Sequence, residues 1–203
     1  MSTSTASPDT TSMSSNRIAT ALAIGSVLAA LGCLGYISLN GDTPRESFSN
    51  PVNTVAGIAA TLGAVVLALT LAKWRTTTLP AWALTVSAAG LVMVAANSWF
   101  AGTGIRAVAD HTSNEQFKDL IFEAPWLIAM SVPNMVLCLV GFIALAVAGW
   151  RQRSLPRSSS VLLVLAGLVS VFPAYPPGLL LASAALFIAS RSQARSSRHL
   201  AGS

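Results

Sequence analysis

Five long stretches of this chain contain no ionisable side chain. No Asp, Glu, Lys, Arg or His occurs in residues 18–40, 51–72, 79–100, 124–150 or 158–190. As a helix, about 20 apolar residues are enough to cross the hydrocarbon core of a bilayer. The whole chain is 53% hydrophobic and only 9% charged, whereas a soluble domain carries about 25% charged residues. The sequence therefore predicts an all-α, polytopic membrane protein whose surface contacts the lipid bilayer.

The last uncharged stretch contains a cluster of helix-breaking residues between Pro173 and Gly178. As a single helix, residues 160–190 would reach about 46 Å, well beyond a hydrocarbon core of about 30 Å. As two helices, 158–172 and 177–190, each part is short for a span. Two interpretations are therefore open: six membrane helices if the cluster is a turn, and five if it is only a kink.

The distribution of basic residues favours six spans. With six spans and a cytoplasmic N-terminus, nine of the twelve basic residues fall on the cytoplasmic side, which is the usual bias of membrane proteins. With five spans, the arginines of the C-terminal segment would lie opposite the other basic clusters. We therefore predict that the segment from Pro173 to Gly178 is an outer hairpin turn. The predicted location is the cytoplasmic (inner) membrane, with both termini cytoplasmic.

The predicted organisation has three parts. Residues 1–16 are rich in Ser and Thr and lack basic residues, so we expect a disordered cytoplasmic tail. Residues 191–203 are predicted to form a basic cytoplasmic tail. Residues 17–190 between them form a helical bundle. Its predicted spans are 17–39, 51–72, 79–100, 124–150, 158–172 and 177–190.

The outer loop between the third and fourth spans contains a predicted short helix. Ser113 is followed three residues later by Gln116, a spacing that resembles a capping box and marks a helix start. Phe117, Leu120 and Ile121 would then share one face of the helix. We expect an amphipathic helix that either lies on the outer leaflet or folds over the bundle as a lid.

The same loop holds a candidate polar site made of His111, Glu115 and Asp119. Their spacing of four residues would align them on one helix face, and three or four such ligands are enough for a metal. The capping signal at Ser113, however, places His111 before the helix starts. We therefore predict a solvated polar face and no metal site. The sequence also lacks a GxSxG elbow, and we predict no catalytic residue and no cofactor.

Within the predicted spans, Asn97, Pro133 and Asn134 are the candidate residues for ligand binding or helix packing. Pro133 removes a backbone hydrogen bond and is predicted to kink its helix. Asn134 is placed to satisfy the freed carbonyl group or to bind a ligand, and Asn97 to join it. The absence of ionisable residues from the spans argues against proton-coupled transport. A route for another substrate, lined by carbonyl and hydroxyl groups, stays open.

Small residues recur four positions apart in the first two predicted spans. They are Gly25/Ala29, Ala56/Ala60/Ala64 and Gly57/Thr61. This spacing lets helices approach closely. We expect these faces to pack within the chain, and a membrane protein partner is the alternative.

The C-terminal part of the chain, RSLPRSSSVLLVLAGLVSVFPAYPPGLLLASAALF, resembles the last hairpin of uncharacterised six-span membrane proteins of GC-rich bacteria. In those proteins an inner Leu-Pro-Arg segment precedes a helix, a proline-glycine turn and a final helix. The resemblance covers about the last 40 residues and the overall plan of spans. It implies the architecture and no particular mechanism.

Three classes of function are consistent with this sequence. The first expectation is an accessory or interaction subunit of a membrane complex, because buried charges are absent and small-residue faces are present. The alternative is a small transporter or channel for a neutral or lipidic molecule. The third is an outer-face enzyme that would use the loop around His111. The net charge of +5 is explained by cytoplasmic segments facing anionic lipid, so no nucleic acid partner is expected.

Overall fold

The computed structural model of the chain describes residues 9–37, 41–74, 79–123, 125–171 and 175–201. Within these ranges it contains eight α-helices and no β-strand, which confirms the all-α prediction. The helices are α1 (Asp9–Ile37), α2 (Pro44–Ser49), α3 (Pro51–Lys73), α4 (Ala81–His111), α5 (Asn114–Phe122), α6 (Pro125–Arg151), α7 (Arg157–Val169) and α8 (Tyr175–Ala201).

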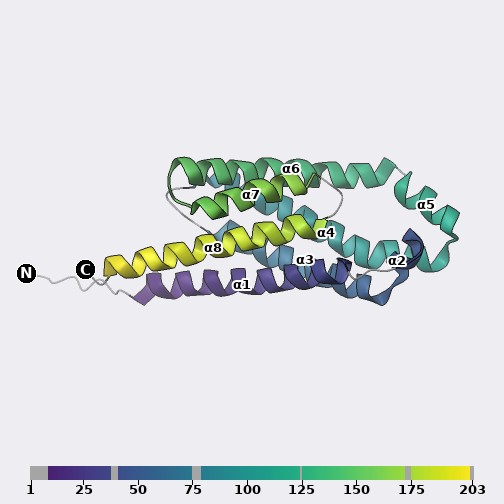
Figure 1. Cartoon of the computed structure of the whole chain (residues 1–203), viewed down its shortest axis with the longest axis horizontal. Coiled ribbons are helices and arrows are strands. Elements are labelled where there is room, and N and C mark those ends of the chain that lie inside the picture. Colours follow the sequence, from purple (N-terminus) through teal and green to yellow (C-terminus); the bar gives the residue numbers. More distant parts are fainter. Residues whose placement is uncertain (1–8, 38–40, 75–78, 124, 172–174, 202–203) are drawn as a thin grey trace, which may run out of the picture.

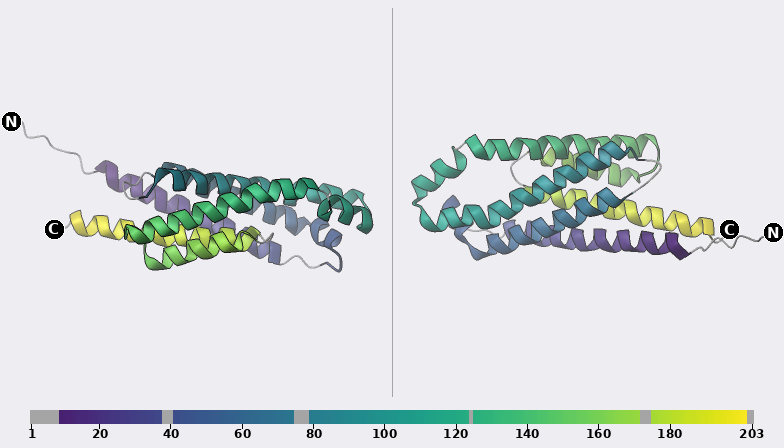
Figure 2. Two further views of the ribbon diagram at one scale, coloured as in Figure 1. Left: turned by 90° about the horizontal axis from the view of Figure 1, so that it is seen from above. Right: turned by 180° about the vertical axis from the view of Figure 1, so that it is seen from behind.

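Six of the helices form a closed ring. Going round it, α1 packs against α3, α3 against α4, α4 against α6, α6 against α7, α7 against α8, and α8 back against α1. Neighbouring helices run antiparallel and make an elongated bundle (Figure 1), which the views from above and from behind also show (Figure 2). A single apolar core that includes Leu22, Leu67, Leu91 and Phe142 runs through the ring.

The small residues noted in the sequence lie between helices of the same chain. A Cβ atom added to Gly63 would come within 2.8 Å of the backbone nitrogen of Ala29, and one added to Gly57 within 2.8 Å of the Cα atom of Gly102. The backbones of α1 and α3, and of α3 and α4, therefore approach closely because no side chain separates them. Other helices of the same chain therefore cover these small-residue faces.

Four helices are long and apolar enough to cross a membrane. They are Arg17–Gly35, Pro51–Lys73, Ala81–His111 and Ala129–Arg151. The apolar helices Arg157–Val169 and Pro177–Ser192 are shorter. At 1.5 Å per residue, α7 reaches about 20 Å, against a hydrocarbon core of about 30 Å. The structure thus has the predicted helical membrane-type fold, but four helices of spanning length instead of six.

The last uncharged stretch consists of two helices and is not one kinked helix. α7 and α8 pack against each other in opposite directions (Figure 1), and residues 172–174 of the predicted turn lie outside the described residues. A Cβ atom on Gly178 would lie 2.7 Å from Ser170 Oγ, and one on Gly167 would lie 3.4 Å from the carbonyl oxygen of Leu139. Leu139 is near the middle of α6. The hairpin tip, which we define as Ser170 and Gly178, therefore lies about half-way along the bundle.

Three helices extend by two turns or more beyond their predicted ends. α1 begins at Asp9, inside the predicted tail of residues 1–16, and α8 continues to Ala201, through most of the predicted tail of residues 191–203. α4 runs to His111, past the predicted end of the third span. Adding a residue to an existing helix costs far less free energy than nucleating a new one. Polar residues on either side of an apolar helix are therefore incorporated into it.

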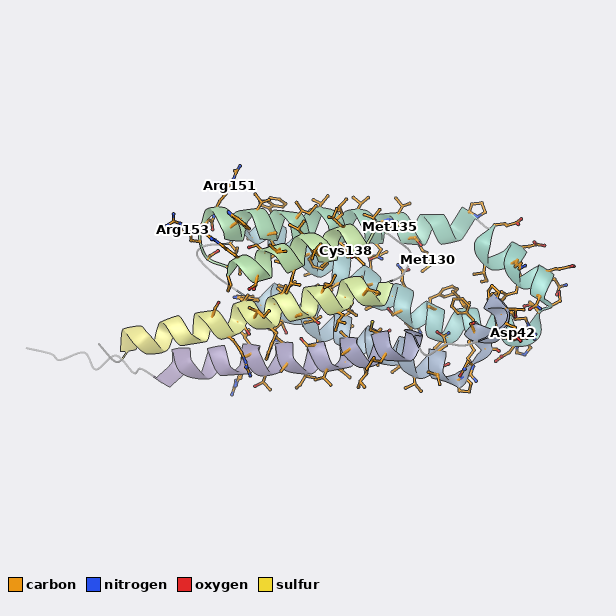
Figure 3. The ribbon with its side chains drawn as sticks, viewed as in Figure 1. Asp42, Met130, Met135, Cys138, Arg151 and Arg153 are labelled. Atoms are coloured by element: carbon orange, nitrogen blue, oxygen red, sulfur yellow. The ribbon has the colours of Figure 1, made fainter. Side chains whose placement is uncertain are left out.

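The two ends of the bundle carry different charges. The basic end, where α1 starts, α8 ends and α6 turns into α7, is defined by Arg17, Lys73, Arg151, Arg153, Arg157 and Arg191. The acidic end, formed by α2, α5 and the end of α4, is defined by Asp42, Glu46, Asp110, Glu115, Asp119 and Glu123. Figure 3 shows Arg151 and Arg153 at one end and Asp42 at the other. Segregation of basic residues to one end is the pattern that orients a membrane protein.

Candidate functional site

The contact between α4 and α6 brings the predicted span residues to one interface. A Cβ atom on Gly90 of α4 would lie 2.9 Å from Cys138 Sγ of α6, and one on Gly141 of α6 would lie 2.7 Å from Ser87 Oγ of α4. These two pairs fix the antiparallel register of the helices. Asn97 is two helical turns beyond Gly90 and therefore lies on the same face of α4.

Asn134 lies on the matching face of α6, one turn before Cys138. The Cys138 thiol donates a hydrogen bond to Asn134 Oδ1 at 3.5 Å. With the register set by Gly90 and Cys138, Asn134 is level with Val94, one turn from Asn97. The structure thus brings two of the predicted residues, Asn97 and Asn134, to the same helix interface.

Three polar groups at this interface are buried without a hydrogen-bond partner among the described residues. They are Ser87 Oγ, Asn97 Nδ2 and Asn134 Nδ2, and we call these three residues the polar seam. Asn134 is 1% exposed and Asn97 6% exposed. An unpaired buried donor costs about 1–3 kcal/mol, and such groups in a native structure require a specific explanation. The polar seam extends over about 15 Å of α4, from Ser87 to Asn97.

A third buried asparagine shows the contrasting case. Asn53 is 1% exposed, but its side-chain amide donates to the carbonyl oxygen of Ala101 at 3.0 Å and to that of Phe48 at 3.4 Å. This amide joins α3 to α4 and to the end of α2. Asn53 is therefore a packing residue, whereas Asn97 and Asn134 retain unused donors.

The third predicted span residue, Pro133, does not join the polar seam. α6 continues through Pro133 as a single helix from Pro125 to Arg151, and the Pro133 side chain is exposed on the outside of the bundle. Because neighbouring positions on a helix point about 100° apart, Asn134 faces inward while Pro133 faces outward.

The hairpin tip lies beside the polar seam. The Ser170 hydroxyl donates to the carbonyl oxygen of Ala166 at 2.7 Å, and the Ser170 side chain lies near the Cys138 thiol. Ser87, Cys138 and Ser170 were not predictable as site residues, because isolated small polar residues in an apolar helix have no distinctive spacing. The one available signal was the cluster of helix-breaking residues between Pro173 and Gly178, which predicts a turn there.

The predicted polar site of the outer loop does not assemble. His111 is the last residue of α4, whereas Glu115 and Asp119 lie on α5, and the extended backbone of Thr112 separates the two helices. All three side chains are exposed. Across the described ranges, no three His, Cys, Asp or Glu side chains come close enough to hold a metal ion.

The helix α5 forms as predicted from its capping box. The Ser113 hydroxyl accepts from the Gln116 backbone, and the Gln116 side chain accepts from the Ser113 backbone. Phe117 and Ile121 are buried against Ile105 and Ala109 near the end of α4. The helix therefore folds over the acidic end of the bundle. Leu120, which was expected on the buried face, is 49% exposed.

Polar contacts join the other elements of the acidic end. Arg45 Nε of α2 donates to the carbonyl oxygen of Ala109 at 2.8 Å, and Arg106 Nη1 donates to Thr54 Oγ1 at 2.8 Å. Arg106 also pairs with Asp110 at 3.6 Å, in a partly exposed geometry that contributes little stability. Arg45 and Arg106 thus connect α2, α3 and α4 through hydrogen bonds.

Comparisons of the chain with protein-family models, with curated proteins and with solved structures find no match.

Proposed function

We propose that this protein spans the cytoplasmic membrane four times and adds a re-entrant hairpin, α7–α8, that enters from the cytoplasmic side. Four spans and a hairpin leave both termini and the basic end in the cytoplasm, in agreement with the positive-inside rule. The length of α7 and the position of the hairpin tip near the middle of α6 support this arrangement. Backbone that turns inside the membrane is tolerated where protein surrounds it.

Cysteine labelling tests this topology in a background in which Cys33 and Cys138 are replaced by alanine. Asn114→Cys at the acidic end is expected to react with a membrane-impermeant maleimide in intact cells. Gln152→Cys at the basic end is expected to react only after permeabilisation. Val171→Cys, next to the hairpin tip, is expected to resist labelling from both sides. Rapid labelling of Val171→Cys in intact cells would establish six spans instead.

Within this architecture, we propose that the protein is a small channel or transporter for an uncharged polar molecule, which binds along the polar seam. The unpaired side-chain amide nitrogens of Asn97 and Asn134 are the observation that carries the proposal. A carbonyl or hydroxyl oxygen of a bound solute would accept hydrogen bonds from them. The uncharged spans favour a neutral solute, because a buried charge would have no counter-charge nearby.

Flux measurements in proteoliposomes test this function, with glycerol and urea as the probe solutes. Asn134→Leu is expected to lower the flux at least about tenfold, because it removes a donor worth about 1.4 kcal/mol or more to the passing solute. The same substitution is expected to raise the free energy of unfolding by about 1 kcal/mol, since an unpaired buried donor disappears. Asn114→Leu, an exposed asparagine on α5, is the matched control.

Lost flux together with retained stability distinguishes an asparagine that binds the solute from one that is only structural. A purely structural asparagine would lose stability together with flux when replaced by leucine. Equal flux for the wild type, Asn134→Leu and empty liposomes would rule out passage of these solutes through the polar seam.

An accessory subunit is the second candidate function. The small-residue faces that motivated it are occupied within the bundle, so a partner would need another surface. The outer face of α5 is the part that supports this candidate, because Leu120 is exposed there among Glu115, Lys118 and Asp119. Co-purification of a stoichiometric partner that is lost in Leu120→Glu would favour it. The third expectation, an outer-face enzyme, has no support from the scattered positions of His111, Glu115 and Asp119.

A further inference from the structure

A groove of about 360 Å³ runs between α6 and α7 at the basic end of the bundle. Val147 and Trp150 of α6 and Val161 and Leu165 of α7 line its apolar walls. These four side chains are all more than two-fifths exposed, so they are on the outer surface of the ring. This surface faces lipid in a membrane protein. The groove is therefore a suitable apolar environment for an acyl chain.

The basic end of the groove carries a concentration of positive charge. Arg151 lines the groove, and Arg153 and Arg157 follow in the turn and at the start of α7. Figure 3 shows Arg151 and Arg153 together at this end. All three arginines are exposed, and none of them forms an ion pair with a carboxylate of the described residues.

Arg153 has an unusual backbone conformation for its residue type. Its φ of 51° is left-handed, and it is the one non-glycine residue with positive φ among those described. It follows the last turn of α6, where the backbone nitrogen of Ser154 bonds to the carbonyl oxygen of Gly149 at 3.0 Å. Glycine is the favoured residue at such a position because it has no Cβ penalty. An arginine there places a guanidinium group in the turn between α6 and α7, at some cost in stability.

The first turn of α7 supplies unused hydrogen-bond donors. Its N-cap residue is Pro156, which makes no side-chain cap hydrogen bond, so the first amide groups of the helix are left for another acceptor. The hydroxyl groups of Ser154, Ser159 and Ser160 are buried and have no partner in the described part of the chain. Ser160 is 1% exposed and also lines the groove.

We propose that this is a binding site for an anionic phospholipid. The phosphate group sits at the N-terminus of α7, where the helix dipole, the arginines and the Ser160 hydroxyl group all favour negative charge. One acyl chain lies in the apolar groove between α6 and α7. The site is separate from the polar seam and does not depend on the proposed transport function. A bound lipid would hold α7, and hence the hairpin, against α6.

Native mass spectrometry of the full chain tests the site, with phosphatidylglycerol and phosphatidylcholine as the two probes. The wild type is expected to retain phosphatidylglycerol at least about tenfold more strongly, since the ammonium group of phosphatidylcholine neutralises its own phosphate charge and would be repelled by the arginines. The double variant Arg153→Gly/Arg157→Ala is expected to lose this preference. Because glycine suits the left-handed position, the variant should fold at least as well. Arg17→Ala, which removes an arginine elsewhere at the basic end, is expected to retain the preference.

Three results would overturn the proposal. Equal retention of the two lipids by the wild type would show that the charge is not recognised. An unchanged preference in the double variant would place the lipid elsewhere. Displacement of phosphatidylglycerol by an equal concentration of glycerol phosphate would identify a site for a soluble anion, because that competitor has the phosphate but no acyl chain.

Discussion

Replacing Phe117 with alanine is expected to release α5 from the acidic end of the bundle. Phe117 is 0% exposed, and its ring centroid lies 5.9 Å from that of Phe48 in α2, at an angle of 41°. Removing a buried phenylalanine side chain typically costs about 3–5 kcal/mol. With nine residues, α5 is too short to be a stable helix alone. The loss should therefore unfold α5 locally and leave the ring of helices intact.

Hydrogen exchange of the α5 amide groups measures this effect, with the amide groups of α3 as an internal reference. Leu120→Ala is the matched control, because Leu120 belongs to the same helix but is 49% exposed; we expect a change within about 0.5 kcal/mol. If α5 lay on the leaflet, lipid would surround both residues and both variants would exchange alike. Equal exchange in the two variants would therefore contradict the packing of α5 against α4 and α2.

Gly57→Ala is expected to lower the free energy of unfolding by about 2 kcal/mol. The new Cβ atom would lie 2.7 Å from the carbonyl oxygen of Ser98 and 2.8 Å from the Cα atom of Gly102. Both are backbone atoms, so α3 and α4 must move apart, at a cost near the upper limit of about 3 kcal/mol for overpacking. The higher helix propensity of alanine offsets about 1 kcal/mol of this cost. Separation would also strain the hydrogen bond from Thr54 Oγ1 to Gly102, now 2.8 Å long.

Gly167→Ala provides the control for this prediction. Gly167 lies in α7, and a Cβ atom there would make ordinary contacts of 3.4 Å with Ile143 and Leu139. The same gain in helix propensity then applies without the clash, so stability should be unchanged or raised by up to about 1 kcal/mol. Unfolding of both variants in mixed detergent micelles gives the comparison. Equal stability of Gly57→Ala and Gly167→Ala would show that α3 and α4 are not in close contact.

Features that depend on a few consecutive residues were predictable from the sequence. The uncharged stretches predicted the apolar helices, because a membrane core excludes ionisable groups whatever the tertiary arrangement. The capping box at Ser113 and Gln116 predicted the start of α5, because its hydrogen bonds join residues three apart. The candidate residues Asn97 and Asn134 were also identifiable, since an amide group is rare in an otherwise apolar helix.

The number of spanning helices was not predictable in the same way. Hydropathy identifies both halves of the last uncharged stretch as apolar segments that are short for a span, and charge favours counting them as two spans. Only the packing of Gly167 against Leu139 shows how far the hairpin extends along α6. The sequence predicts a turn near Gly178, but it does not show how deep in the bundle this turn lies.

The composition of the candidate site also depended on tertiary structure. Along a helix in water, a polar stripe shows which face is outside, but both lipid and protein neighbours of a membrane helix are apolar. The sequence therefore cannot show which face of α4 meets α6. The contacts of Gly90 with Cys138 and of Gly141 with Ser87 set the register that aligns the polar seam. The helices and their caps thus follow from residues close together in the sequence. Which polar groups share the buried interface between α4 and α6 is decided by the close packing of helices at glycines.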